Sequence, residues 1–174
     1  MSRITAAQTL LVVVDVQEAF RRYDAFERVA AGSARLLAAA RIVGMAAVVS
    51  EQYPKGLGHS APELGLAGER VLEKTCFSAA GADGFDRAGA DTAIVCGLES
   101  HVCVENTVRG LLAAGVDVHL AADACGSRGE LDHRLAIERM RGDGAVIESV
   151  ESVLFGLFDG AGSDEFKAVQ RLVL

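Results

Sequence analysis

Six short apolar runs recur at regular intervals along this chain, and helical patterns separate them. The runs are rich in β-branched residues and apolar at successive positions, as in parallel strands that helices cover on both faces. They are Leu10–Val14, Met45–Val49, Val71–Glu73, Thr92–Cys96, Val116–Ala121 and Ala145–Glu148. The intervening patterns predict helices over Asp24–Ile42, Gly84–Gly89, Val102–Ala114, Glu130–Arg141, Ser152–Phe158 and Asp164–Leu172. The sequence therefore predicts an α/β fold, a three-layer α/β/α sandwich around a six-stranded, mainly parallel, doubly wound sheet.

The composition narrows the classes of protein to which this chain can belong. With 174 residues and no visible linker or low-complexity tract, one domain over residues 1–174 is expected. The net charge is −7, and no stripe of lysines and arginines is present, which argues against a nucleic-acid partner. No apolar run reaches the ~18 residues of a membrane span, and the N-terminus shows no cleavable signal pattern. A cytoplasmic protein with no membrane partner is expected.

The spacings of cysteine and histidine argue against a disulfide frame or a metal site. The four cysteines show no C-x-x-C pair and are expected to be free thiols: Cys76, Cys96, Cys103 and Cys125. The four histidines are scattered, without the short spacings of zinc ligands. No G-x-G-x-x-G follows the first apolar run, which makes a nucleotide-binding domain the weakest alternative. We therefore expect no metal and no cofactor.

Three reactive side chains follow three different predicted strands. Asp15 follows the first strand, Lys74 follows the third, and Cys103 lies in the first turn of the helix after the fourth. In open α/β sheets the carboxyl ends of the strands form the ligand-binding edge, so these groups are expected to converge. Each one alone has an ordinary structural explanation, such as a small buried cysteine or a solvated lysine. The coincidence of the three favours a site.

The chemistry of these groups is that of a nucleophilic site. A thiolate is the reactive form of cysteine, and a nearby ammonium together with a helix N-terminus favours it over the thiol. A carboxylate can accept the thiol proton and return it to a leaving group. The backbone amides of the turn from Glu99 to Cys103 offer donors for a developing oxyanion. The long irregular stretch Glu51–Glu69, which holds both prolines, is expected to cover this edge.

Several motifs, in order along the chain, resemble one known family. Val14–Gln17, Glu73–Ser78 and Gly97–Val104 are similar to motifs of the isochorismatase-like cysteine hydrolases. Glu51–Gly58 and Ala121–Arg128 resemble the subgroup of isochorismatase-domain-containing proteins. The resemblance covers nearly the whole chain, so it is specific for the family, but its motifs do not specify a substrate.

The resemblance implies a hydrolase of a small-molecule amide, or of a related acyl or C–N bond, that works through a cysteine thioester. The catalytic triad of the family falls on Asp15, Lys74 and Cys103, and its oxyanion hole on the backbone amides of Glu99 and Cys103. A cis peptide is common just before the first of these amides, here at Leu98–Glu99. For each aromatic residue of the expected pocket, a place in the core explains the sequence equally well. The pocket is expected to include Gln17, Phe20, Gln52, Tyr53, Phe77 and His101.

Two departures from the family pattern narrow what the resemblance implies. Nicotinamidases of this family bind a metal through an Asp-x-His pattern after the second strand, where this chain reads Ser50–Tyr53. True isochorismatases act on a vinyl ether and lack the cysteine that is present here as Cys103. The first departure argues against a metal and against nicotinamidase activity, and the second favours acyl chemistry through a thioester over vinyl-ether hydrolysis.

The assembly state and two other classes of function stay open at this point. The same scaffold could serve as a non-catalytic binding module with an inactive triad. Cys103 could instead belong to a thiol-redox protein, with Cys76 or Cys125 as its partner. The predicted helix Ser152–Phe158 carries more apolar residues than one buried face needs. A homo-oligomer is therefore expected, since relatives in this family often associate.

Overall fold

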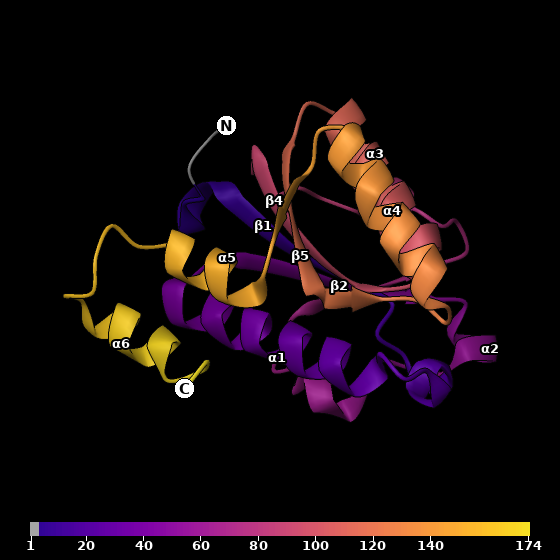
Figure 1. Cartoon of the computed structure of the whole chain (residues 1–174), viewed down its shortest axis with the longest axis horizontal. Coiled ribbons are helices and arrows are strands. Elements are labelled where there is room, and N and C mark those ends of the chain that lie inside the picture. The colour runs from indigo at the N-terminus through magenta and orange to yellow at the C-terminus, as the bar shows by residue number, and fades with distance from the viewer. Residues whose placement is uncertain (1–3) are drawn as a thin grey trace.

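The structure, a computed structural model, is an all-parallel sheet with helices on both faces, which confirms the predicted sandwich (Figure 1). It describes residues 4–174. Met1–Arg3, part of the N-terminus where no signal pattern is expected, lie outside the described residues. The strands are β1 (Thr9–Val14), β2 (Ala46–Gln52), β3 (Arg70–Lys74), β4 (Thr92–Leu98), β5 (Asp117–Gly126) and β6 (Val146–Glu148).

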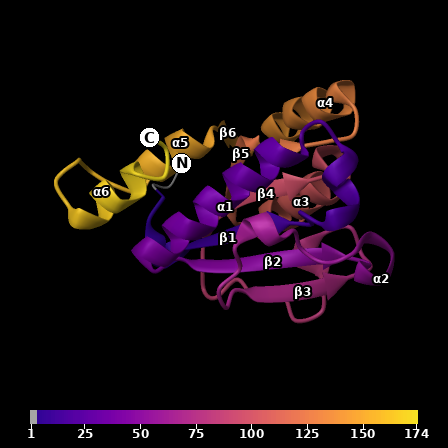
Figure 2. The ribbon, with the colours of Figure 1, turned by 90° about the horizontal axis from the view of Figure 1, so that it is seen from below.

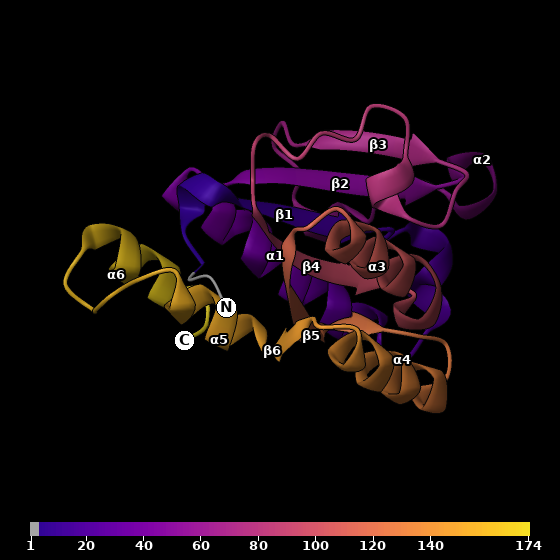
Figure 3. The same ribbon diagram turned by 90° about the horizontal axis from the view of Figure 1, so that it is seen from above.

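Helices form the two outer layers. The helices are α1 (Phe26–Val43), α2 (Pro54–Leu57), α3 (Glu105–Ala113), α4 (Glu130–Gly142), α5 (Val150–Gly156) and α6 (Asp164–Gln170). Figures 2 and 3 show α1, α5 and α6 on one face of the sheet and α3 with α4 on the other. Within residues 4–174, no helix is long and apolar enough to cross a membrane.

The order of the strands defines where a ligand can bind. The order is β3-β2-β1-β4-β5-β6, so the sheet grows in opposite directions from β1 and from β4. The helix after β1 and the helix after β4 consequently cover opposite faces, which opens a crevice at the carboxyl ends of these two strands. Asp15 follows β1 directly, and Cys103 follows β4 after a short turn. The two candidate residues therefore lie on either side of this crevice.

The core lies on both faces of the central strands, beneath α1 and α5 on one side and α3 and α4 on the other. Every residue of β1 and β4 is buried, as expected for strands with helices on both faces. The apolar face of α1 is buried, and the helix ends at Gly44 in a left-handed cap whose amide donates to the Ala40 carbonyl. This face includes Phe26, Val29, Leu36, Leu37 and Ala40. Burying a large aliphatic or aromatic side chain stabilises the fold by about 1.5–3 kcal/mol. This packing holds the strand ends that carry the candidate site.

Gly97 permits an unusually close approach of β4 to β1, directly beside Asp15. Its φ is +127°, and a Cβ at this position would lie 2.0 Å from the Val14 carbonyl oxygen. The pairing of β4 with β5 also shifts register between Val95 and Gly97. Only a residue without a side chain fits here, so Gly97 is required for the local geometry of the site.

The structure corrects one predicted helix. Residues Gly84–Gly89 form turns and extended backbone, and the regular element in this region is a short 3-10 helix at Ala79–Gly81. The reason lies in the backbone, since Gly84, Ala88 and Gly89 all have positive φ angles between 52° and 78°. An α-helix cannot contain residues in that conformation.

The apolar surplus on the predicted helix Ser152–Phe158 is covered within the chain. The element is α5, and its buried residues face the core. Phe155 and Phe158 contact Phe166 of α6, with ring centroids 5.7 Å and 5.5 Å apart. Helix α6 thus occupies the apolar surface that the sequence analysis assigned to a partner subunit, so this surface is not evidence for a homo-oligomer.

Candidate active site

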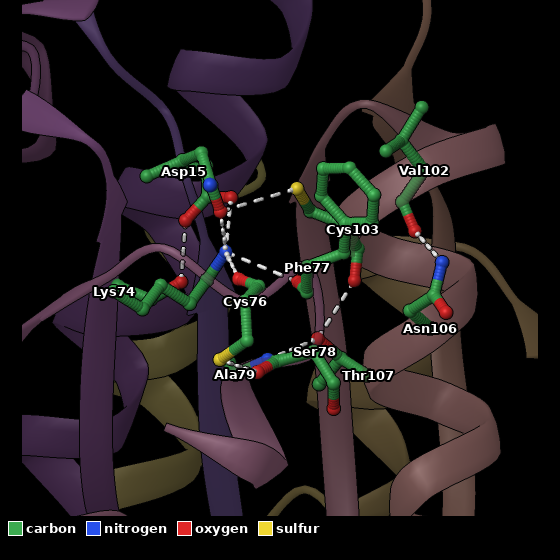
Figure 4. A network of polar contacts seen from close by, with 12 residues as sticks. Asp15, Lys74, Cys76, Phe77, Ser78, Ala79, Val102, Cys103, Asn106 and Thr107 are labelled. Carbon is green, nitrogen blue, oxygen red and sulfur yellow. Dashed lines mark hydrogen bonds and ion pairs between the residues drawn. The ribbon is translucent and has the colours of Figure 1, made fainter. Parts of the chain in front are cut away.

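Asp15 and Lys74 form a buried ion pair at the carboxyl edge of the sheet (Figure 4). Lys74 Nζ lies 2.8 Å from Asp15 Oδ2, and neither side chain is exposed to solvent. The other carboxylate oxygen accepts a hydrogen bond from the Ser50 hydroxyl at 2.6 Å. Asp15 adopts a left-handed φ of 52°, which aspartate tolerates better than most residues. The ion pair therefore joins the carboxyl ends of β1, β2 and β3.

Four acceptors surround the ammonium group of Lys74. Besides Asp15, Nζ contacts Gln52 Oε1 at 2.7 Å and the carbonyl oxygens of Phe77 at 3.1 Å and Cys76 at 3.3 Å. An ammonium group has three protons to donate, so these acceptors compete for them. Groups from β1, β2 and the segment after β3 thus fix the position of the positive charge.

Cys103 approaches this ion pair from the opposite side of the crevice. It lies in a π-helical turn, Ser100–Val104, which links β4 to α3. The sequence predicts a helix from Val102, whereas regular α-helix begins only at Glu105. Cys103 is 7% exposed, and its Sγ lies 3.8 Å from Gln52 Oε1. The sulfur therefore lies beside the Asp15–Lys74 pair and contacts the Gln52 side chain.

Thr107 connects the turn that carries Cys103 to the segment after β3. Its Oγ1 donates to the Cys103 carbonyl at 2.7 Å and accepts from the Ala79 amide at 2.8 Å. Figure 4 shows both bonds, together with the more exposed bond from Asn106 Nδ2 to the Val102 carbonyl. Because Thr107 is fully buried, its hydroxyl replaces the water that these two backbone groups would otherwise bind.

The thiol of Cys103 is electrostatically coupled to both charges. Burial raises its pKa well above the ordinary value, and the negative charge of Asp15 adds to the rise. The positive charge of Lys74 opposes both effects and lowers the pKa, but it does not outweigh them. The sequence analysis expects a stabilised thiolate, whereas the surroundings in the structure favour the neutral thiol.

The structure contains the cis peptide expected at Leu98–Glu99. The Glu99 carboxylate, which is 8% exposed, accepts hydrogen bonds from Arg128 Nε at 2.9 Å and Nη2 at 3.0 Å. The next residue, Ser100, donates from its hydroxyl to the Gly126 carbonyl at 2.9 Å. Both contacts anchor the start of the turn that carries Cys103 to the end of β5. The oxyanion role of the Glu99 and Cys103 amides remains a prediction.

The side chain of Gln17 forms hydrogen bonds with the backbone of Gln52. The Gln17 side chain is fully buried, and its Oε1 accepts from the Gln52 amide at 2.8 Å. Its Nε2 donates to the Gln52 carbonyl at 3.0 Å and to the Gly58 carbonyl at 2.6 Å. All of these bonds are internal, so Gln17 braces the loop after β2, whereas the sequence analysis assigns it to the substrate pocket.

The remaining expected pocket residues have different surroundings. Phe20 is buried and packs against Tyr23, with ring centroids 5.4 Å apart. Tyr53 and Phe77 are 54% and 56% exposed. His101 is partly buried, with Nδ1 3.0 Å from the Ser127 hydroxyl. Tyr53 and Phe77 are thus available to a ligand, whereas Phe20 belongs to the core.

A cavity of about 490 Å³ lies beside the end of β3. Tyr53, Lys74 and Cys76 are among the residues that line it, whereas Asp15 and Cys103 are not. The cavity therefore lies beside the end of β3 and not at the sulfur of Cys103.

A second carboxylate holds the loop that follows β2. Glu51 is buried, its Oε2 lies 2.9 Å from His59 Nδ1, and its Oε1 accepts from the Ser60 amide at 2.6 Å. Burial raises the pKa of Glu51, but the bonds from His59 and Ser60 outweigh it, and the net pKa is lowered. The bond to Glu51 raises the pKa of His59. These contacts of Glu51 with His59 and Ser60 therefore hold the stretch Glu51–Glu69 beside the site.

Motifs and spacing did not indicate a role for Ser50 or Thr107. Ser50 is the first polar residue after the apolar part of β2, and it is fully buried, so its position at the strand end was a usable signal for a partner of Asp15. Thr107 lies four residues after Cys103, and residues at this spacing share one face of a helix. Within the described residues 4–174, no cluster of three or more Cys, His, Asp or Glu side chains is arranged to hold a metal ion.

Comparison with known proteins now adds evidence of kinship. The isochorismatase domain family matches residues 9–152. The chain is 37% identical over 179 residues to mouse isochorismatase domain-containing protein 2A, covering 99% of this chain and 86% of the relative. This chain belongs to the isochorismatase family. The membership confirms the resemblance found in the sequence, and the family relationship supports a hydrolase.

Solved structures share the isochorismatase fold over nearly the whole length. A MAR1 ribonuclease from Caenorhabditis elegans is 36% identical, with a TM-score of 0.92 and coverage of 99% of this chain and 92% of that one. YcaC from Escherichia coli, described as an octameric hydrolase of unknown specificity, is 20% identical, with a TM-score of 0.88 and coverage of 99% and 89%. At that identity, the likeness to YcaC establishes the fold alone.

Proposed function

We propose that this isochorismatase-family protein is a cysteine hydrolase of a small-molecule amide or a related acyl bond. The observation that carries the proposal is the cluster at the crevice between β1 and β4, where Lys74 pairs with Asp15, and Lys74 and Cys103 both contact Gln52 Oε1. Three groups with complementary roles in acyl transfer come from three separate strand ends. A purely structural explanation of a buried ion pair does not require a cysteine beside it.

In the first half-reaction, Cys103 Sγ attacks the carbonyl carbon of the substrate. The thiol proton passes to the carboxylate of Asp15 as the S–C bond forms, and the carbonyl π electrons move onto oxygen. The amides of Glu99 and Cys103 are proposed to bind this oxyanion, and one such donor is worth about 3–4 kcal/mol. Re-formation of the C=O bond expels the amine, which takes the proton from Asp15, and a thioester remains.

In the second half-reaction, water hydrolyses the thioester. Asp15 accepts a proton from the attacking water, the C–S bond breaks, and the proton returns to the sulfur of Cys103. The products are a carboxylic acid and an amine, and the resting thiol is restored.

The raised pKa of Cys103 fits a base-assisted attack. A neutral thiol in the resting protein requires a nearby carboxylate to remove its proton at the moment of reaction. Lys74 compensates the negative charge that passes between Asp15, the sulfur and the oxyanion, because its ammonium is held by fixed acceptors.

The decisive experiment compares Cys103→Ala and Cys103→Ser with Cys96→Ala, the matched change at a buried cysteine whose thiol contacts Ser33 of α1. A panel of small amides, carbamoyl compounds and esters serves as substrate, and intact-protein mass spectrometry looks for an acyl adduct. We expect both Cys103 variants to lose about 10³-fold or more in kcat, and the control to stay within about twofold. Unchanged turnover in Cys103→Ala rules the mechanism out.

The same panel separates the other classes of function. An RNA substrate is included, because one relative carries the name ribonuclease. Turnover of RNA but of no small molecule contradicts the proposal. Alkylation of Cys103 without any turnover favours a binding module, and a peroxide-induced disulfide that dithiothreitol reverses favours a redox protein.

We also propose a cytoplasmic homo-oligomer. The octameric state of a protein with the same fold supports an assembly, and free thiols, one of them exposed, are compatible with a reducing compartment. Light scattering coupled to size exclusion gives the mass of the purified protein, and a mass of one chain contradicts the assembly.

A further inference from the structure

The side chain of Gln52 lies between Lys74 and Cys103. Its Oε1 contacts Lys74 Nζ at 2.7 Å and Cys103 Sγ at 3.8 Å, so one oxygen accepts from the charged and from the reactive group. The side chain thus links the end of β3 to the turn after β4.

The orientation of the Gln52 amide is fixed. Its Nε2 donates to the Thr75 carbonyl at 2.8 Å, which leaves the oxygen directed at Lys74 and Cys103. A flipped amide would place its NH₂ group against the Lys74 ammonium, and two donors would then face each other. The backbone on either side is held by Gln17 through two further bonds, at 2.8 Å and 3.0 Å.

We propose that Gln52 is a positioning residue for the nucleophile: its neutral amide oxygen holds the Lys74 ammonium and the Cys103 thiol in one reactive arrangement. This inference rests on the proposed cysteine-hydrolase function and deepens it. It replaces the pocket-lining role that the sequence analysis assigns to Gln52. A neutral acceptor is required, because a carboxylate would add a second negative charge beside the thiol and compete with Asp15 for Lys74.

The test replaces Gln52 with Glu, which changes charge at nearly constant shape, and with Leu, which removes the acceptor. Gln8→Glu is the matched control, since Gln8 is exposed at the opposite end of β1. The rate of Cys103 alkylation by iodoacetamide is compared among the proteins at fixed pH values from 7 to 10 by peptide mass spectrometry. This measurement does not depend on turnover. A negative result for Gln52 can therefore be distinguished from a failure of the proposed hydrolase function.

We expect Gln52→Glu to slow alkylation at a fixed pH by about tenfold or more, because a negative charge disfavours the thiolate. We expect Gln52→Leu to speed alkylation at the same pH, because the negative end of the amide dipole no longer faces the sulfur. Gln8→Glu should leave the rate unchanged. Alkylation rates that coincide in all four proteins, with native circular dichroism, overturn the inference.

Kinetics on an amide substrate then separate positioning from substrate contact. We expect both Gln52 variants to lose about tenfold or more in kcat with little change in KM, because the ammonium and sulfur lose their arrangement. A raised KM with unchanged kcat would mean that Gln52 binds substrate instead, and would also overturn the inference.

Discussion

Lys74 Nζ and Asp15 Oδ2 lie 2.8 Å apart, with both side chains sealed from solvent. A charge buried in this way is costly unless its partner remains, because neither group can recover its hydration. The pair therefore serves the stability of the fold as well as the proposed chemistry. The two roles can be separated by experiment.

Removal of one partner should destabilise the protein strongly. We expect Lys74→Met to cost about 3–5 kcal/mol in the free energy of unfolding, because it leaves the Asp15 carboxylate buried without its counterion. Urea titration measures this. The double variant Asp15→Leu/Lys74→Met should recover part of the loss. Lys167→Met, which breaks an exposed pair with Asp164, should change stability by less than about 1 kcal/mol. Equal losses at the two pairs would contradict this account.

Neutralising Asp15 should have opposite effects on thiol reactivity and on turnover. The negative charge of Asp15 raises the pKa of the Cys103 thiol, so Asp15→Asn is expected to lower that pKa and to speed alkylation near pH 7. The same change should abolish hydrolysis, since the proposed base is lost. Peptide mass spectrometry follows labelling, with exposed Cys76 as the internal reference and buried Cys96 and Cys125 as unreactive sites. Slower labelling of Cys103 in Asp15→Asn would be inconsistent with the electrostatics described.

The Glu51–His59 contact should make loop stability depend on pH. The pKa of His59 is raised and that of Glu51 is lowered in the folded protein. The His59 contribution is fully present below its unfolded pKa of about 6.5 and is lost as pH rises through the raised folded value. The Glu51 contribution is present above its unfolded pKa of about 4.3 and is lost as pH falls through the lowered value.

The difference in Tm between the native protein and His59→Ala should therefore be largest near pH 5 to 6.5, and should shrink above that range. Thermal scans across pH values, at low and high salt, measure it. High salt should reduce the difference, because the His59 side chain is largely exposed. A difference that does not vary between pH 5 and 9 would exclude this ion pair as its cause.

Gly97 should tolerate no side chain. A Cβ at this position would lie 2.0 Å from the Val14 carbonyl oxygen, and the φ of +127° is unfavourable for other residues. We expect Gly97→Ala to cost more than about 4 kcal/mol and to reduce soluble yield. Gly142→Ala is the control, because a Cβ added there, at the end of α4, would meet no atom of another segment within 4 Å. The control should be neutral or stabilising by up to about 1 kcal/mol. Similar unfolding curves for the two variants would refute the close-approach argument.

Thr107 should contribute more to the free energy of unfolding than its neighbour Asn106. Thr107→Val keeps the shape but leaves the Cys103 carbonyl and the Ala79 amide without their buried partner. We expect a loss of about 1–3 kcal/mol. Asn106→Ala removes an exposed bond to Val102 from the same helix start and should cost less than about 0.5 kcal/mol. Urea unfolding of both variants decides the comparison, and a larger loss for Asn106→Ala would reverse it.

The sequence by itself determined the α/β/α sandwich and the convergence of Asp15, Lys74 and Cys103 at one edge of the sheet. Apolar runs with turn signals identify parallel strands, and all parallel strands end on one edge of the sheet, so residues that follow them must lie near each other. For this reason Asp15 and Lys74 could be predicted to converge with Cys103, although Asp15 and Cys103 are 88 positions apart in the sequence. The family motifs added the cis peptide at Leu98–Glu99, which the structure contains.

Only the tertiary structure decided the protonation of Cys103 and the hydrogen bonds that hold the reactive groups in place. The raised pKa of Cys103 results from burial and from a charge on a different strand, and neither can be read from the residues beside it. The contacts of Gln52 and Gln17 join segments distant in sequence, and the cover of α5 by Phe166 depends on how the last helix folds back. The periodicity of apolar residues in the sequence indicates which residues are buried. Hydrogen-bond partners and electrostatic interactions depend instead on which buried residues become neighbours in the fold.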